Sequence, residues 1–251
     1  MLLSEMTWPA VAALSKDTPI VIPTAALEQH GHHLPVFTDS ILVGEITRRA
    51  EQALAKHVLL TPVMWLGNSA HHLDFAGTMS AGPRTYIDLV VDMVENFITH
   101  GFRRIVIVNG HGGNNVPGDQ AVFEVRQRHR ERDDLLLIFS CYWALGAKPH
   151  EADRSIEQQG MGHACEWETS MILALRPELV GDYRAAANVD PAGQFDPAHR
   201  AWTTKDRSAA GHIGNPSAAA KAKGETLLNL FTADVVQLLQ RVLDWNGQGW
   251  G

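Results

Sequence analysis

The stretch TPIVIPTAALEQHGHHLPVFTD, residues 18–39, joins an apolar segment to a dense cluster of polar side chains. Residues 18–26 are short, apolar and rich in β-branched side chains, which predicts a buried strand. The residues that follow include three histidines, a glutamate and an aspartate, all of which can bind metal ions. This junction predicts a fold in which the ends of strands carry the functional site.

The rest of the chain alternates between segments typical of strands and segments typical of helices. Further strands are expected at 58–66, 103–110 and 134–143, and helices at 40–57, 83–101, 114–132, 165–179 and 217–245, the last as one helix or two. Such alternation implies a mostly parallel sheet that helices cover on both faces. We therefore expect an α/β fold that forms a single domain over residues 1–251. The polar residues 185–215, rich in Gly, Pro and Asp, predict a long surface loop.

Composition limits the classes of protein to which the chain can belong. With 251 residues, 45% of them hydrophobic, the chain can bury a substantial core. A formal charge of −7 argues against nucleic acid or an anionic membrane as a partner. Two cysteines, Cys141 and Cys165, make no disulfide framework, which favours the cytoplasm. Residues 1–17 lack the pattern of a signal peptide, and the apolar runs are shorter than the ~20 residues that span a bilayer.

Four residues at expected strand ends are candidates for metal ligands. Glu28 and His30 are two apart, so on an extended chain they point to the same side, and Asp39 follows them at the rim of the sheet. His111, in IVIVNGHGGNN (105–115), follows the strand expected at 103–110. Imidazole and carboxylate together suit Zn, Mn or Fe(II). Six further histidines are expected to be structural or exposed: His32, His33, His57, His100, His129 and His199.

A further carboxylate, Glu168, lies in MGHACEWETSMILAL (161–175). On a helix it would share an apolar face with Cys165 and Met171, whereas Glu166 would fall on the polar side. A carboxylate on an apolar face needs a partner, because an unpaired buried charge is costly. That partner is a metal, a cation in a salt bridge or a backbone N–H, and the helical pattern leaves all three open.

Three motifs in this order, EQHGHHLPVFTD (28–39), NGHGGNN (109–115) and GHACEWETS (162–170), resemble those of the creatininase (creatinine amidohydrolase) family. The resemblance covers nearly the whole chain and implies a three-layer α/β/α architecture, commonly assembled as a homohexamer. It also implies a small-molecule substrate whose C–N bond, in an amide, cyclic amide or formamide, is cleaved by water that two metal ions activate.

The resemblance further implies a role for each candidate residue. Glu28 and His111 would hold one divalent ion, His30 the other, and Asp39 would bridge the two. His163 matches the family's catalytic histidine, a general acid or base, and Trp143 matches a tryptophan that lines the pocket. The two ions would be Zn, Mn or Fe.

The chain departs from creatininase itself near His111. After this histidine creatininase has a tyrosine and a glutamate, and the glutamate is a metal ligand there. This chain has Gly112 and Gly113 at the two positions. Because Glu168 lies on the apolar face of the expected helix, we expect Glu168, rather than Glu166, to replace the missing glutamate ligand. The missing side chains predict a roomier pocket, in which Gln158 or Gln159 bonds to the substrate, and creatinine should be a poor substrate.

Three alternatives stay open at this point. The same site could cleave a C–C bond of a keto-cyclitol, a sugar-like ring. The chain could bind metal without being an enzyme. Finally, NGHGGNN could hold a phosphate, although it lacks the Lys-Ser/Thr of a P-loop and the G-x-G-x-x-G spacing.

Overall fold

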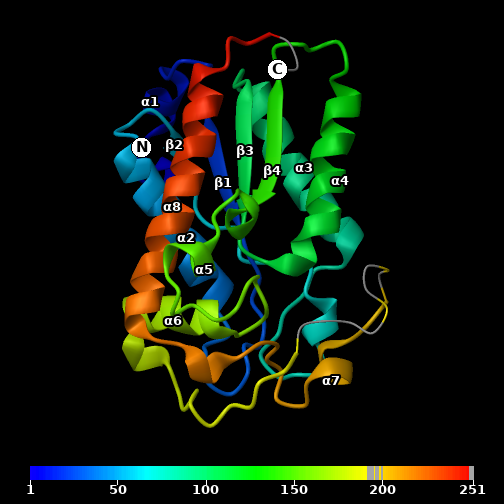
Figure 1. Cartoon of the computed structure of the whole chain (residues 1–251). Coiled ribbons are helices and arrows are strands. Elements are labelled where there is room, and N and C mark those ends of the chain that lie inside the picture. The colour runs from blue at the N-terminus through cyan, green and yellow to red at the C-terminus, as the bar shows by residue number, and fades with distance from the viewer. Residues whose placement is uncertain (191–194, 196–197, 199, 249–251) are drawn as a thin grey trace.

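A parallel sheet forms the centre of the molecule in the computed structural model, which describes residues 1–190, 195, 198 and 200–248 (Figure 1). Its strands, in the spatial order β2-β1-β3-β4, are β1 (Ile20–Thr24), β2 (Leu59–Leu60), β3 (Arg104–Asn109) and β4 (Leu136–Cys141). Each neighbouring pair runs parallel, with Ile20 beside Leu59 on one side and Ile105 on the other. The predicted α/β fold with a parallel sheet is confirmed.

Helices cover both faces of the sheet, because successive side chains of a strand point to opposite sides. Val21 packs into one apolar cluster, and its neighbours Ile20 and Ile22 pack into the other. The first cluster includes side chains of α2 (Thr38–Ala53), α6 (Glu166–Leu175) and α8 (Lys221–Asp244), and the second those of α3 (Pro83–Thr99) and α4 (Asn115–Arg128). Figure 1 shows these two helical layers on either side of the strands. Short helices α1 (Trp8–Ala12), α5 (Pro149–Ala152) and α7 (Thr204–Arg207) lie outside them.

Two details of the sequence-based assignment change. The strand expected at 58–66 is reduced to β2, because Pro62 has no N–H with which to continue the ladder. The chain returns to β1 at Met64, whose N–H donates to Pro23 at 2.9 Å. The tail that could have formed two helices is a single one, α8.

The predicted surface loop at 185–215 is only partly at the surface. His212 and Ile213 are buried, and Ile213 exchanges two backbone hydrogen bonds with His163, of 2.8 and 2.7 Å. The loop therefore packs against the segment that leads into α6. Residues 191–194, 196–197 and 199 of the loop lie outside the described part of the chain.

The order of the strands determines where a site can form. β1 lies between β2 and β3, so the connection after β1 leads to β2 on one side, and the chain then crosses to the other side of β1 to form β3. In open parallel sheets, such a switch point opens a crevice beyond the carboxyl ends of the strands. The loops that carry the predicted ligands gather at this end, at the bottom of Figure 1. Within the described residues, no helix is long and apolar enough to cross a membrane.

Candidate metal centre

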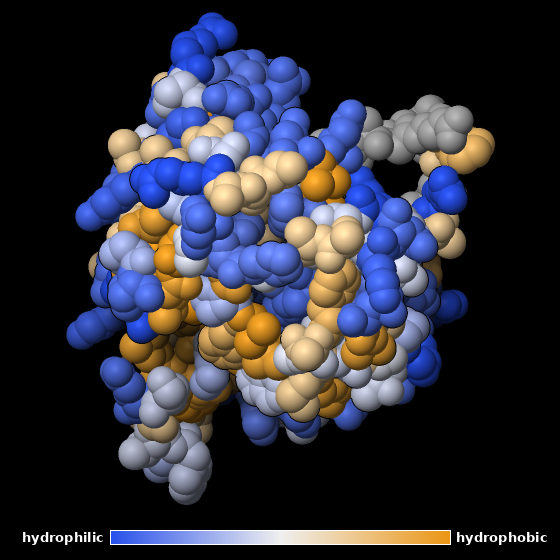
Figure 2. Space-filling view, turned by 90° about the horizontal axis from the view of Figure 1, so that it is seen from below, coloured by the Kyte–Doolittle hydropathy of each residue, from blue (hydrophilic) through white to orange (hydrophobic). Residues whose placement is uncertain are grey.

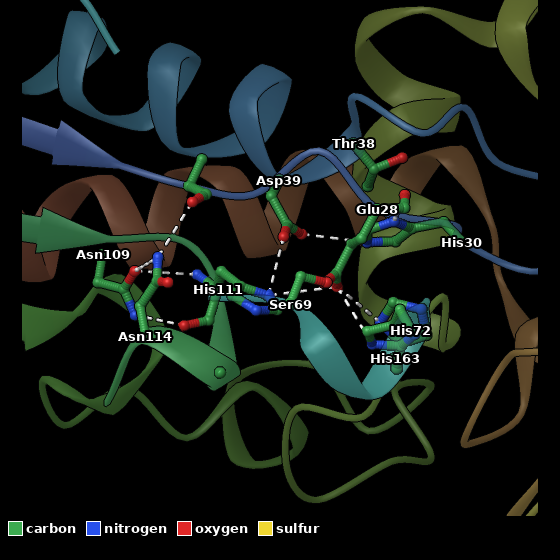
Figure 3. A network of polar contacts seen from close by, with 12 residues as sticks. Glu28, His30, Thr38, Asp39, Ser69, His72, Asn109, His111, Asn114 and His163 are labelled. Carbon is green, nitrogen blue, oxygen red and sulfur yellow. Dashed lines mark hydrogen bonds and ion pairs between the residues drawn. The ribbon is translucent and has the colours of Figure 1, made fainter. Parts of the chain in front are cut away.

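The predicted metal ligands meet at the switch point although they come from four segments of the chain. Figure 3 shows four of them, Glu28, His30, Asp39 and His111. Glu28 and His30 follow β1, and His111 follows β3. Asp39 and Glu168 lie in the first turns of α2 and α6, where the helix dipole favours a negative charge. Figure 2 looks onto this end of the molecule, which mixes hydrophilic surface with hydrophobic patches.

The Asp39 carboxylate lies between two groups of atoms that could bind a metal ion. Its Oδ1 lies 3.0 Å from His30 Nε2, and that nitrogen lies 3.6 Å from Glu168 Oε1. Its Oδ2 lies 3.1 Å from His111 Nδ1, which is 3.2 Å from Glu28 Oε1. The two oxygens of one carboxylate therefore face two different sets of ligand atoms.

The hydrogen bonds of the two imidazoles test whether the site fits a metal. His30 Nδ1 lies 3.1 Å from the backbone oxygen of Glu28, and His111 Nε2 lies 3.1 Å from that of Asn68. A carbonyl oxygen only accepts, so these nitrogens carry the hydrogens. In the neutral rings, His30 Nε2 and His111 Nδ1 are then acceptors that face carboxylate oxygens. Acceptors that face each other in a buried site need a cation between them, so the residues fit divalent metal ions.

Unsatisfied atoms and shifted pKa values point the same way. Among the described residues, the buried atoms His30 Nε2 and Asp39 Oδ2 form no hydrogen bond of regular geometry. Burial, the largest single influence, would lower the pKa of His111, but the Glu28 and Asp39 carboxylates together outweigh burial and raise that pKa to about 10. Burial likewise opposes charge on His30, yet Asp39 raises the pKa of His30 well above its usual value. The carboxylates thus stabilise positive charge at both rings.

Three residues of the site were not predicted from the sequence: Ser69, His71 and His72, all in the loop between β2 and α3. The Ser69 hydroxyl donates to Glu28 Oε2, and His72 Nε2 lies 3.4 Å from Glu28 Oε1. His71 stacks on His111 with ring centroids 5.7 Å apart. Adjacent histidines soon after an expected strand were the available signal. Their loop has no helical or strand period, so nothing in the sequence showed which way they point.

Gln29 determines how His72 faces Glu28. The Gln29 amide nitrogen donates to Gly211 O at 2.8 Å and lies 2.7 Å from His72 Nδ1, while its oxygen accepts from Gly31 N–H at 2.8 Å. These contacts identify the amide oxygen and nitrogen, so His72 Nδ1 is an acceptor. With Nδ1 accepting from Gln29, His72 presents Nε2–H to the Glu28 carboxylate as a hydrogen-bond donor.

The two glutamates of α6 have different surroundings in the structure, but the difference is not the one between an apolar and a polar face that the helical pattern predicted. The helix is buried from Glu166 through Ile172, so the supposed polar side faces protein and not solvent. Glu166 is fully buried and accepts hydrogen bonds from Lys223 Nζ at 2.6 Å and from Gln158 N–H at 2.7 Å. Glu168 faces His30 and the cavity. Its role as a ligand stays a prediction that this geometry favours.

His163 and Trp143 both line a cavity of about 220 Å³ beside the ligand cluster. His163 Nε2 donates to the backbone oxygen of Gln29 at 2.8 Å, which leaves Nδ1 facing Glu28 Oε1 at 3.4 Å. Burial and the neighbouring His30 hold the pKa of His163 well below its usual value, so the ring is neutral. Ala164 turns the chain sharply into α6, with a φ of 48°.

The glycines after His111 show why no carboxylate could stand there. A Cβ at Gly113 would collide with the backbone oxygen of Asn68 and with the His111 ring, so the ligand at this position in creatininase has no room. A Cβ at Gly112 would meet nothing within 4 Å. Gly112 lines the cavity, and it leaves open the space that a tyrosine would fill.

Other sequence expectations have mixed outcomes. His33 is buried and donates to Ala164 O at 3.0 Å, whereas His57 and His100 are exposed. His129 pairs with Glu95 at 2.7 Å, and His199 lies outside the described residues. The expectation that Gln158 or Gln159 faces the substrate is not supported, because neither lines the cavity and Gln158 Nε2 donates to Gly160 O at 2.5 Å.

The chain resembles known proteins over nearly its whole length. A family model described as "Creatininase: Creatinine amidohydrolase" matches residues 4–239. A creatinine amidohydrolase of Pseudomonas putida is 27% identical over 95% of each chain. A mycofactocin precursor peptide peptidase of Mycobacterium tuberculosis is 31% identical over 93% of this chain and 88% of its own. A 3-dehydro-scyllo-inosose hydrolase of Thermotoga maritima is 30% identical over 78% of this chain and 63% of its own.

Solved structures agree with this assignment. A crystal structure of creatininase superimposes with a TM-score of 0.83 at 26% identity and covers 96% of each chain. Related creatininase structures are described as a manganese form and, for one mutant, as a Zn-Zn type. The match of the family model over most of the chain shows that this protein belongs to the creatininase family of hydrolases.

Proposed function

We propose that this hydrolase cleaves a C–N bond, in an amide, cyclic amide or formamide, of a small polar molecule. The observation that carries the proposal is the position of Asp39. One of its oxygens lies 3.0 Å from His30 Nε2 and the other lies 3.1 Å from His111 Nδ1. Glu28 and His111 would hold one divalent ion, His30 and Glu168 the other, and Asp39 would bridge them. When bound, such ions supply an acidified water molecule and positive charge for a developing oxyanion.

The protein's own groups would handle the substrate and the protons. His163 is neutral and has Nδ1 toward the cluster, so it can accept a proton from water and pass it to the leaving nitrogen. Trp143 provides an apolar wall of the cavity. Water adds across the C–N bond, so the products are a carboxylic acid and an amine. A cavity of about 220 Å³ suits a substrate or reacting group of a few heavy atoms.

A panel of small molecules tests which bond the protein cleaves and in which class of substrate. Protein stripped with EDTA and reloaded with Zn or Mn is incubated with creatinine, formamides, lactams, N-acyl dipeptides and a keto-cyclitol, and the products are identified by NMR. We expect acid and amine from at least one amide, no turnover by stripped protein, and a low kcat/KM for creatinine. Cleavage of the keto-cyclitol alone would replace C–N with C–C hydrolysis. Metal uptake without any turnover would favour a binding protein.

A further inference from the structure

The cavity beside the metal centre has one side-chain amide among the described residues that line it, Asn115. The ligand cluster and His163 form one wall. Trp143 and Met161 contribute apolar surface, and Gly112 contributes open space. Asn115 is the first residue of α4 and is exposed, so its side chain is not needed to fill the core. Its orientation is nevertheless determined from behind by buried groups.

The first of these groups is Asn109, at the end of β3. Three donors converge on its Oδ1: Asn114 Nδ2 at 3.0 Å, Thr24 Oγ1 at 3.1 Å and the backbone N–H of His111 at 3.2 Å. An atom that receives three donors is an oxygen, which identifies the other amide atom as Nδ2. Asn109 is completely buried, so water does not compete for these hydrogen bonds.

Asn109 in turn orients Asn115. The Asn109 Nδ2 group donates one hydrogen to the backbone oxygen of His111 at 2.6 Å and the other to Asn115 Oδ1 at 3.1 Å, and the Cys141 thiol donates to the same Asn115 oxygen at 2.8 Å. Cys141 is a thiol and not a thiolate, because burial raises its pKa to about 11. Two buried donors therefore hold the amide oxygen of Asn115 toward the protein. The amide nitrogen has no partner among the described residues and belongs to a side chain that lines the cavity.

We propose that Asn115 is a substrate-binding residue, whose Nδ2 group donates a hydrogen bond to a carbonyl or carboxylate oxygen of the molecule in the cavity. Cys141 and Asn109 act through it as positioning residues. This inference rests on the proposed function only in taking the cavity as the substrate site. It adds a specificity element that the metal ligands cannot provide, because a donor amide selects oxygen acceptors on one side of the substrate.

The experiment measures binding without turnover. Zinc-loaded protein is titrated calorimetrically with acetohydroxamate, a small probe with two acceptor oxygens, and zinc content is measured on the same samples. We expect Asn115→Leu, which keeps the approximate shape of the side chain, to weaken probe binding about 3–10-fold, the usual effect of losing one hydrogen bond, with unchanged zinc content. Gln120→Ala is the matched control, because this exposed amide on α4 has its one side-chain hydrogen bond within the described part of the chain to Glu124 and does not line the cavity.

Two further measurements address the positioning residues. Cys141→Ala removes the S–H donor and should weaken probe binding, whereas Cys141→Ser keeps a donor and should restore much of it. The side-chain amide signals of Asn115 in a ¹⁵N–¹H spectrum should shift when acetohydroxamate is added, and those of Gln120 should not. Unchanged affinity in Asn115→Leu would overturn the proposal, even if C–N hydrolysis is found. Conversely, a panel without C–N turnover would leave this binding result intact.

Discussion

Two isosteric substitutions in the first turn of α6, Glu166→Gln and Glu168→Gln, should have opposite effects on stability and metal content. Glu166 is fully buried, forms an ion pair with Lys223 at 2.6 Å and does not line the cavity. Glu168 lies 3.6 Å from His30 Nε2 and lines the cavity. The same chemical change, two residues apart, therefore removes a structural ion pair in one variant and a proposed ligand in the other.

The magnitudes follow from burial. Removing one partner of a buried ion pair costs roughly 3–5 kcal/mol. Glutamine keeps one acceptor oxygen, so we expect about 3 kcal/mol for Glu166→Gln. For a chain of this size each kcal/mol shifts Tm by roughly 2–4 °C, so Tm in EDTA should fall by roughly 6–12 °C. Glu168→Gln weakens the pair with His30 at 3.6 Å but also relieves repulsion among three carboxylates in the metal-free site, so Tm in EDTA should change much less than in Glu166→Gln.

The assay combines thermal unfolding in EDTA with elemental analysis of zinc-loaded protein. Glu166→Gln should keep its zinc at room temperature while losing stability, and Glu168→Gln should keep most of its stability while losing zinc. If Glu166→Gln loses more zinc than Glu168→Gln, the assignment of the additional ligand is refuted. If both variants unfold at the temperature of the wild type, the ion pair with Lys223 contributes less than its burial implies.

Three further outcomes test the metal centre. Asp39→Ala should empty both metal positions, whereas His30→Ala should mainly empty one; equal loss of metal, by elemental analysis, would reject the bridging role. His163→Gln should keep the metals and slow turnover by about 10²–10⁴-fold, the usual range for a lost acid or base; loss of metal would instead make His163 a ligand. Zinc binding at pH 8 should release protons, because the carboxylates raise the pKa of metal-free His30 and raise that of His111 to about 10. Affinity should therefore rise with pH, and calorimetry in buffers of different ionisation enthalpy would contradict this if no protons were released.

Much of the fold could be predicted from sequence because its signals are local. The apolar run that contains β1 and the helical period of α2 depend on the chain's own pattern, and both lie where that pattern places them. β2 was overestimated for a local reason too, since Pro62 interrupts its pairing. Ligand types in the stretch after β1 could also be read directly, because carboxylate and imidazole are recognisable without coordinates.

The orientation of side chains in irregular segments could not be predicted in this way. His72 faces Glu28 because contacts from distant segments, Gln29 and Thr204, hold its Nδ1 from behind. Asn115 turns its oxygen inward only because Cys141 and Asn109 stand behind it in the folded chain. None of these contacts has a period in the sequence.

The sequence by itself thus determined the class of fold, the position of Glu28, His30 and His111 just after strands, and the chemical types of the predicted ligands, since each depends on residues close together in the chain. The tertiary structure alone decided which carboxylate of α6 faces the cluster. Helical periodicity shows which residues share a face, but not what covers that face. Lys223 of α8 covers Glu166, and His30 faces Glu168. These partners lie far away in the sequence, 57 positions in the case of Lys223, and only the packing of α6 against α8 and the end of β1 brings them together.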